Sequence, residues 1–271
     1  MKHPASISKS VLGTYFEKLE YEETELFATD IFKHMEWRKS ILPSYPFSIK
    51  QDSVRSTCNA MGALEYLFPL LLSTHDFFPE TRISEWSHIG DLFELFCTAS
   101  IKQQIGNAIL IGNEFGGFPS DFDDCLTEAC KIINEKKGPR HPKAKDFQDA
   151  GVDIIAWRNF DNRKGQIVIL VQCASGKNWA SKGGDIRRRL WEQLVFWAVE
   201  PMKALTFPYA FDFDSPAAKD DWIYCAYDAG LLLDRLRLAR FDFSKSGIDY
   251  APISEWAIDQ IEKIKLYLVE D

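Results

Sequence analysis

The sequence contains no apolar run long enough to cross a membrane. Its most apolar stretch, residues 63–72, is short and is interrupted by Glu65 and Pro69, whereas a transmembrane helix needs about 18 or more apolar residues. The first residues also lack the apolar segment of a secretory signal peptide. We therefore expect a cytoplasmic protein that makes no membrane contact.

Motifs for several familiar chemistries are missing as well. None of the six cysteines forms a CxxC pair, and the five histidines are scattered without HExxH spacing, which argues against a structural zinc site. GxGxxG, GxxxxGK[ST] and GxSxG are absent, so dinucleotide-binding, P-loop and hydrolase-elbow functions have no motif to support them. We expect the cysteines to be buried free thiols in a reducing compartment.

What the chain does contain is ordinary globular composition. Hydrophobic residues make up 46% and charged residues 27%, which excludes a disordered or collagen-like chain. The chain has 20 Phe, 9 Tyr and 8 Trp residues, enough for a substantial core. A length of 271 residues allows two domains, or one domain with an added subdomain.

Apolar spacing divides the chain into a helical N-terminal subdomain, residues 1–80, and an α/β domain, residues 81–271. In the first part, helical spacing predicts helices over about 12–39 and 53–73. In the second part, the pattern predicts a helix ending near 104, a strand at 107–112 and a helical insertion over about 113–148. It then predicts strands at 152–157 and 167–173, followed by a helix at 185–199. Strands at 204–210 and 222–226 and helices at 229–239 and 254–269 complete the predicted order.

Three polar residues in this second part form a candidate site. Asp153 begins one predicted strand, Gln172 lies near the end of the next, and Glu94 lies in the preceding helix. A glutamine within an apolar strand needs a polar partner. Carboxylate and amide oxygens suit Mg²⁺, and a divalent cation promotes phosphodiester hydrolysis.

This arrangement resembles the PD-(D/E)XK nuclease superfamily over about residues 83–227. The pieces GVD at 151–153 and VQC at 171–173 are similar to the branch of methylation-dependent restriction nucleases, where Gln can replace the Glu of the motif. The resemblance implies a restriction-endonuclease-like αβββαβ core with a mixed central sheet. It also implies Mg²⁺ or Mn²⁺ as cofactor, with Asp153, Gln172 and Glu94 as its ligands. DNA as substrate and a role in prokaryotic restriction or anti-phage defence follow from the same resemblance.

The sequence departs from the family pattern at the lysine. Ala174 stands two residues after Gln172, where the family has its lysine. Our first candidate for the missing charge is Lys177, which the Ser-Gly step before it can turn back toward the site, and our second is Lys182. A chain that uses neither lysine would have weak catalysis or none.

The charge distribution favours a nucleic-acid partner. The net charge is −8, yet residues 136–189 hold 13 basic and 5 acidic residues, and this basic stretch brackets the candidate site. The residues that we expect to contact nucleic acid are Lys143, Lys145, Lys182, Arg187 and Arg188. The acidic ends of the chain indicate a protein partner or a homo-oligomer.

Two alternatives remain open on the sequence alone. Ala174 at the lysine position and Gln172 in place of Glu also fit a catalytically weakened subunit of the same fold, which binds nucleic acid or a partner protein in a defence complex. RNA or single strands are alternative substrates, since no residue pattern separates them from duplex DNA.

Overall fold

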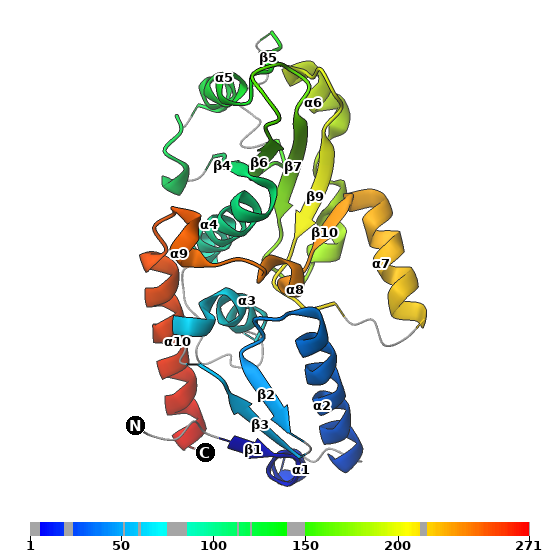
Figure 1. Ribbon diagram of the computed structural model, residues 1–271, viewed down its shortest axis with the longest axis vertical. Coiled ribbons are helices and arrows are strands. Elements are labelled where there is room, and N and C mark those ends of the chain that lie inside the picture. Colours follow the sequence, from blue (N-terminus) through cyan, green and yellow to red (C-terminus); the bar gives the residue numbers. More distant parts are fainter. Residues whose placement is uncertain are drawn as a thin grey trace.

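The computed structural model describes residues 6–18, 24–50, 52–58, 61–74, 86–112, 114–119, 121–139, 150–211 and 216–270. It is a mixed α/β protein with a five-stranded sheet in one half and a three-stranded sheet in the other (Figure 1). The long helix α10 (Ala251–Glu270) runs beside both halves and contacts helices of each.

The five-stranded sheet has the strand order β10-β9-β7-β6-β4. Its strands β4, β6 and β7 are antiparallel neighbours, while β7, β9 and β10 run parallel. The strand bounds are β4 Asn107–Leu110, β6 Ile154–Arg158, β7 Ile167–Cys173, β9 Met202–Thr206 and β10 Leu231–Leu233. The sheet is therefore mixed, as the sequence predicts.

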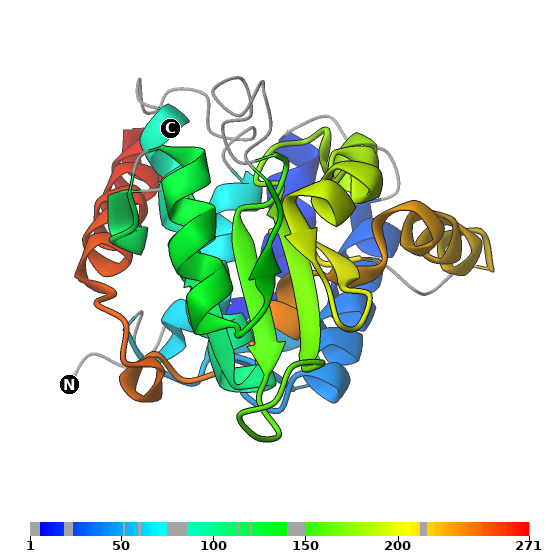
Figure 2. The same cartoon turned by 90° about the horizontal axis from the view of Figure 1, so that it is seen from above.

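Helices cover both faces of this sheet because its central strand is apolar on both sides. Ile169 and Val171 of β7 pack in one core with Phe93 of α4 (Trp86–Ile105). Val168 and Leu170 point to the other face, into a core built with helices α5 (Phe122–Ile132) and α6 (Arg188–Leu194). Such two-sided burial is what a continuous apolar strand favours. Figure 2 shows that α7 (Pro216–Ala229) projects from the side of the molecule opposite α10.

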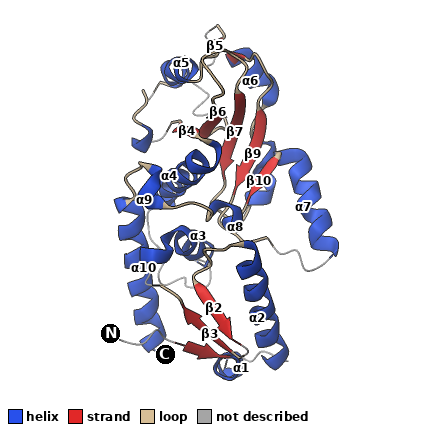
Figure 3. Cartoon of the chain, viewed as in Figure 1, coloured by secondary structure: helices blue, strands red, loops and turns tan. Residues whose placement is uncertain are grey.

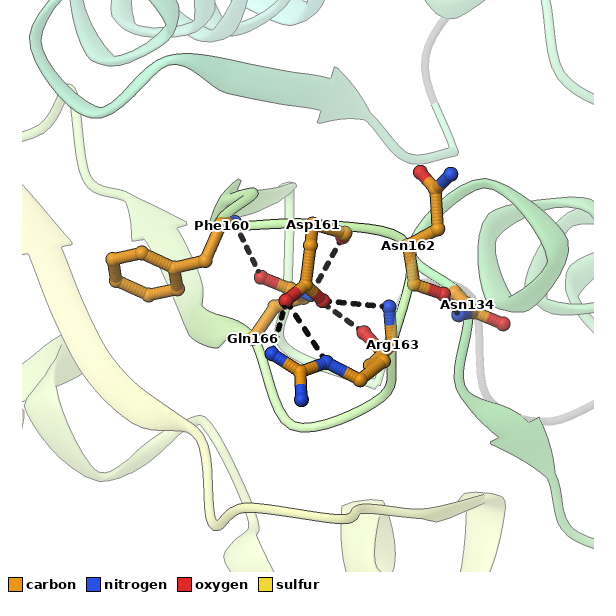
Figure 4. Close-up of polar contacts among 6 residues, drawn as sticks. All are labelled: Asn134, Phe160, Asp161, Asn162, Arg163 and Gln166. Carbon is orange, nitrogen blue, oxygen red and sulfur yellow. Dashed lines mark hydrogen bonds and ion pairs between the residues drawn. The ribbon is translucent and has the colours of Figure 1, made fainter.

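A network of hydrogen bonds closes the turn between β6 and β7 (Figure 4). The buried Gln166 accepts the N–H of Phe160 through Oε1 and donates through Nε2 to the carbonyls of Asp161 and Arg163. Arg163 also pairs with the carboxylate of Asp161. The turn thus sets the register of the hairpin, whose open end lies at the opposite end of both strands.

The N-terminal part is not purely helical, which corrects the sequence prediction (Figure 3). Strands β1 (Ser6–Ser8), β3 (Ser53–Ser56) and β2 (Phe47–Lys50) form an antiparallel sheet. The predicted helix at 12–39 is α1 (Lys9–Lys18) packed on α2 (Thr24–Ile41). The predicted helix at 53–73 begins only at Leu64, as α3 (Leu64–Thr74), because the residues of β3 pair with β2 instead.

Three further predictions near the C-terminus are wrong. Residues 222–226 belong to α7 rather than to a strand. The predicted helix at 229–239 is β10 followed by α8 (Arg235–Leu238), because Asp234 caps the helix between them. The predicted helix at 185–199 is limited to α6, since β8 (Val195–Phe196) pairs with β5 (Lys136–Lys137).

The remaining elements are short and connect the larger ones. They are η1 (Met61–Ala63), η3 (Glu114–Gly116), η5 (Trp179–Gly184) and α9 (Phe243–Ser246). The six cysteines are free. Cys97, Cys125 and Cys130 are buried as expected, whereas Cys173 and Cys225 are half-buried and Cys58 is exposed. Among the helices that the structure describes, none has the length and apolar character that a bilayer span requires.

Candidate active site

Asp153 and Gln172 lie at the open end of the β6–β7 hairpin. The last pair of the antiparallel register is Ile154 with Val171, and Asp153 and Gln172 are the residues next to that pair. The Asp153 N–H donates to the carbonyl of Val171 at 3.0 Å, and its carbonyl accepts the N–H of Ile111 at 2.7 Å. Its carboxylate Oδ2 accepts the N–H of Cys173 at 2.5 Å. This buried carboxylate is therefore held in one orientation.

The Gln172 side chain has an amide oxygen that no described group satisfies. Its Oε1 is buried and has no hydrogen-bond partner among the residues that the structure describes. Its Nε2 donates to Oδ2 of Asp185, at a long distance of 3.5 Å. Buried polar atoms of proteins almost always have a partner, and leaving one without costs about 1–3 kcal/mol. The oxygen is therefore either a source of strain or a ligand position.

Glu94 of the helix α4 lies near Cys173, which follows Gln172 in β7 and therefore points to the opposite face of the sheet. Burial of the Cys173 thiol raises its pKa well above the ordinary value, and the neighbouring Cys97 and the charges of Asp153 and Glu94 raise it further. Both carboxylates thus lie close enough to Cys173 to act on it electrostatically. The raised pKa keeps this thiol protonated, which excludes Cys173 as a nucleophile at neutral pH.

Of the two candidate lysines, Lys182 lies near Gln172 through the carboxylate of Asp185. Lys182 Nζ lies 3.2 Å from Asp185 Oδ2, the same oxygen that the Gln172 amide approaches. Lys177 is exposed in the loop between β7 and η5. The sequence interpretation did not include Asp185. The feature that could have indicated it is its position three residues after Lys182, where the two side chains can form an ion pair.

Ala174 is buried at the position where the sequence resemblance leads to the expectation of a lysine. Its side chain lies in the apolar cluster with Leu205 and Phe207, and its N–H donates to the carbonyl of Thr206 at 2.9 Å. A lysine here would place its charge within this cluster, at a large desolvation cost. The structure therefore explains why this position holds a small apolar residue.

Two glycines hold η5 against the site. Gly151, at φ +75°, precedes Asp153 by two residues, and a Cβ built on it would lie 2.5 Å from the carbonyl oxygen of Asp185. A Cβ on Gly183 would lie 2.9 Å from the Cβ of Ala229 in α7. Only glycine permits both close approaches, because other residues carry a Cβ. These two close approaches place the segment that carries Lys182 between β6 and α7.

The structure brings only part of the expected nucleic-acid-binding set to this edge. Arg187 is exposed two residues after Asp185. Arg188 forms ion pairs with Glu192 and Glu200, which engage its charge. The other two expected residues, Lys143 and Lys145, lie outside the described residues.

The donors gathered here fit a hard divalent cation. Asp153 and Glu94 supply carboxylate oxygens, and Gln172 supplies the buried amide oxygen without a partner in the described part of the chain. Within the described ranges, no three His, Cys, Asp or Glu side chains form a group that could hold a metal. An oxygen-only set completed by an amide is thus the arrangement that this site offers.

Comparison with family models, with curated proteins and with solved structures finds no match to this chain.

Proposed function

We propose that this protein is a metal-dependent nuclease of the restriction-endonuclease-like fold that hydrolyses DNA phosphodiester bonds. The observation that carries the proposal is the buried Gln172 oxygen, which has no described partner and lies at the same open end of the hairpin as Asp153. A site with an oriented carboxylate, an unsatisfied amide oxygen and a nearby lysine suits a cation and a phosphate better than it suits a stable core.

The chain order of the elements supports the same proposal. Helix α4 is followed by β4, β6 and β7, then by α6 and β9, which is the αβββαβ order that the resemblance implies. The element between β4 and β6 is an insertion carrying α5. Asp153 and Gln172 lie on the second and third strands of that order, where the family has its catalytic residues.

Each residue has a distinct role in the proposed reaction. Asp153, Glu94 and Gln172 would hold the cation, Mg²⁺ or Mn²⁺. When bound, such a cation polarises a phosphate and lowers the pKa of a water molecule. The N–H of Cys173 keeps the Asp153 carboxylate oriented. Lys182 places a positive charge beside the site for the phosphate, and Asp185 positions it.

The wider role follows from the resemblance rather than from the geometry. Restriction or anti-phage defence in a prokaryotic cytoplasm is the setting that we propose for this nuclease. The acidic ends of the chain add the proposal of a protein partner or a second copy. Light scattering of the purified protein tests the latter, and an active monomer would contradict it.

The decisive variant is Asp153→Ala. We expect it to abolish Mg²⁺- or Mn²⁺-dependent cleavage of DNA while the protein remains folded, because a fixed anionic ligand is lost. The measurement is cleavage of labelled DNA on a gel, with circular dichroism as the check of folding. Asp161→Asn, at the other end of the same hairpin, is the matched control and should cleave like the wild type. Undiminished cleavage by Asp153→Ala would contradict the proposal.

A second candidate function is a nuclease-fold subunit with a weakened site. It is favoured by the buried Ala174 at the lysine position and by the ion pair that already engages Lys182. This candidate predicts nucleic-acid binding without cleavage. Isothermal titration with Mn²⁺ separates the two, since a weakened site would show no binding that Asp153→Ala removes.

A further inference from the structure

A cavity of about 460 Å³ lies between α2, α7 and the segment around α8 that follows β10. Its wall combines two indoles, Trp37 of α2 and Trp222 of α7, with the guanidiniums of Arg237 and Arg240. Small-molecule sites of proteins usually occupy about 300–1,000 Å³. The cavity is therefore large enough for one nucleotide.

The strand register places this cavity at the same edge of the sheet as Gln172. Gln172 pairs with Leu205 of β9, and Leu205 pairs with Leu232 of β10. Neighbouring strands lie about 4.8 Å apart, so roughly 10 Å separates Gln172 from Leu232. Asp234, which lines the cavity, follows Leu232 by two residues. Ligands of open α/β sheets bind at this carboxyl end of parallel strands.

A chain of aromatic rings also connects the two places. Trp179 begins η5, the element that carries Lys182, and its ring lies 6.1 Å from that of Phe211. The Phe211 ring in turn lies 5.1 Å from that of Trp222 in the cavity wall. The cavity is thus continuous, through packed rings, with the loop that follows the candidate site.

The cavity wall has the chemistry that recognises an unstacked base with its phosphate. The Arg237 guanidinium lies over the Trp222 ring, 4.9 Å from its centre, so this wall combines an indole with a cation, and both groups are ones that stack with unpaired bases. Arg237 donates to the carbonyl of Leu232, and Arg240 donates to that of Ile41. These bonds orient the two cations and use only part of their five donors each. Bases within a duplex are already stacked, so only an unpaired base has a face to present.

We propose that this cavity, lined by Trp37, Trp222, Arg237 and Arg240, binds an unpaired nucleotide of the nucleic-acid substrate beside the cleavage site. The substrate class is then a nucleic acid with a single-stranded segment. The N-terminal part has a role in this arrangement, because Trp37 supplies one wall. The inference rests on the proposed nuclease function for the identity of its ligand.

The test measures binding without cleavage. Fluorescence anisotropy with a labelled oligothymidylate and with a blunt duplex, in EDTA, compares the wild type with Trp222→Ala. We expect Trp222→Ala to weaken oligothymidylate binding about fivefold or more, the loss typical of one stacked base, and to leave duplex binding unchanged. Trp222→Phe, which keeps a ring, should restore most of the affinity. Tyr227→Ala, on the same helix but 90% exposed, is the matched control and should bind normally.

Three results would overturn the inference. The first is unchanged oligothymidylate binding by a folded Trp222→Ala variant, and the second is an equal loss of oligothymidylate affinity in Tyr227→Ala. The third is a loss of affinity in Trp222→Ala that is confined to free thymidine monophosphate, which would make the cavity a mononucleotide site.

The nuclease proposal fails separately. A protein that binds single strands through Trp222 but cleaves nothing with Mg²⁺ or Mn²⁺ contradicts only the nuclease, whereas Asp153-dependent cleavage unaffected by Trp222→Ala contradicts only the cavity.

Discussion

Two glutamines of the same hairpin differ in whether the protein satisfies their side-chain amides. Gln166 satisfies both ends of its amide in the turn, with one bond accepted and two donated. Gln172, at the other end of the same strand, has a buried oxygen with no partner in the described part of the chain. Stability alone explains the first residue but not the second.

This contrast predicts opposite effects of the same substitution. Gln172→Met should leave the free energy of unfolding unchanged or raise it, because an unsatisfied polar atom worth about 1–3 kcal/mol is removed, and should abolish cleavage. Gln166→Met should lower the free energy of unfolding by about 2 kcal/mol or more, because it leaves backbone groups of the turn unpaired. Urea unfolding measures both. Equal destabilisation by the two variants would contradict a functional role for the Gln172 oxygen.

The two lysines after β7 give a second prediction for single residues. Lys182→Ala should lower the cleavage rate at least tenfold, since charge stabilisation at a reacting phosphate typically contributes at least that much. Lys177→Ala should have a smaller effect, because the ion pair with Asp185 places Lys182 next to the Gln172 amide. Single-turnover cleavage at saturating DNA compares them. A larger loss of cleavage rate in Lys177→Ala than in Lys182→Ala would assign the phosphate-binding role to Lys177, our first candidate from the sequence.

Among the elements, η5 is the one whose placement determines the site. It carries Lys182, leads into Asp185 and packs between the entry to β6 and helix α7. Its position depends on a close backbone approach at Gly151, where the Asp185 carbonyl occupies the space of a Cβ. A short irregular helix of this kind is held by its neighbours rather than by its own hydrogen bonds.

Gly151→Ala therefore should disturb both stability and the site. The added methyl group meets the Asp185 carbonyl, and the residue sits at φ +75°, where a Cβ costs about 1–3 kcal/mol. We expect a lower melting temperature together with slower cleavage. Gly184→Ala is the matched control within the same segment, because a Cβ added there would meet no neighbouring atom within 4 Å. A melting temperature of Gly151→Ala equal to that of the wild type would show that the contact at Gly151 is not tight.

For the whole molecule, the distribution of charge matters more than its total. The chain is acidic overall, at −8, while residues 136–189 carry 13 basic residues against 5 acidic ones. The fold separates this basic stretch into different places. Arg187 lies near the candidate site, whereas Arg163 lies in the turn at the far end of the hairpin, paired with Asp161.

Salt dependence of DNA binding should follow this separation. Affinity is expected to fall as salt rises, because phosphate contacts release counterions. Arg187→Ala should lower the slope of the log–log plot by about 0.7–0.9, the value of one phosphate contact. Arg163→Ala should leave that slope unchanged. Anisotropy titrations at several salt concentrations measure both slopes. A lower slope for Arg163→Ala would indicate that DNA contacts the turn between β6 and β7.

Local sequence determined the part of the fold that needs little long-range information. The apolar residues 167–173 form β7 at the predicted bounds, and the helix before 107–110 ends where the pattern predicts. The location of Asp153 and Gln172 at the same end of the hairpin follows from a short turn between adjacent strands. These features depend on periodicity and turn chemistry, which act between near neighbours.

Only the tertiary structure decided the rest, because non-local pairing overrides local preference. Residues 53–56 are a strand since β2 lies beside them, and residues 231–233 are a strand since β9 does. Asp185 joins the site through an approach at Gly151 that lies 34 positions earlier in the chain. The cavity of Trp37 and Trp222 exists because two distant helices meet at one edge of the sheet. No local pattern carries such contacts, which form only when the whole chain buries its apolar surface.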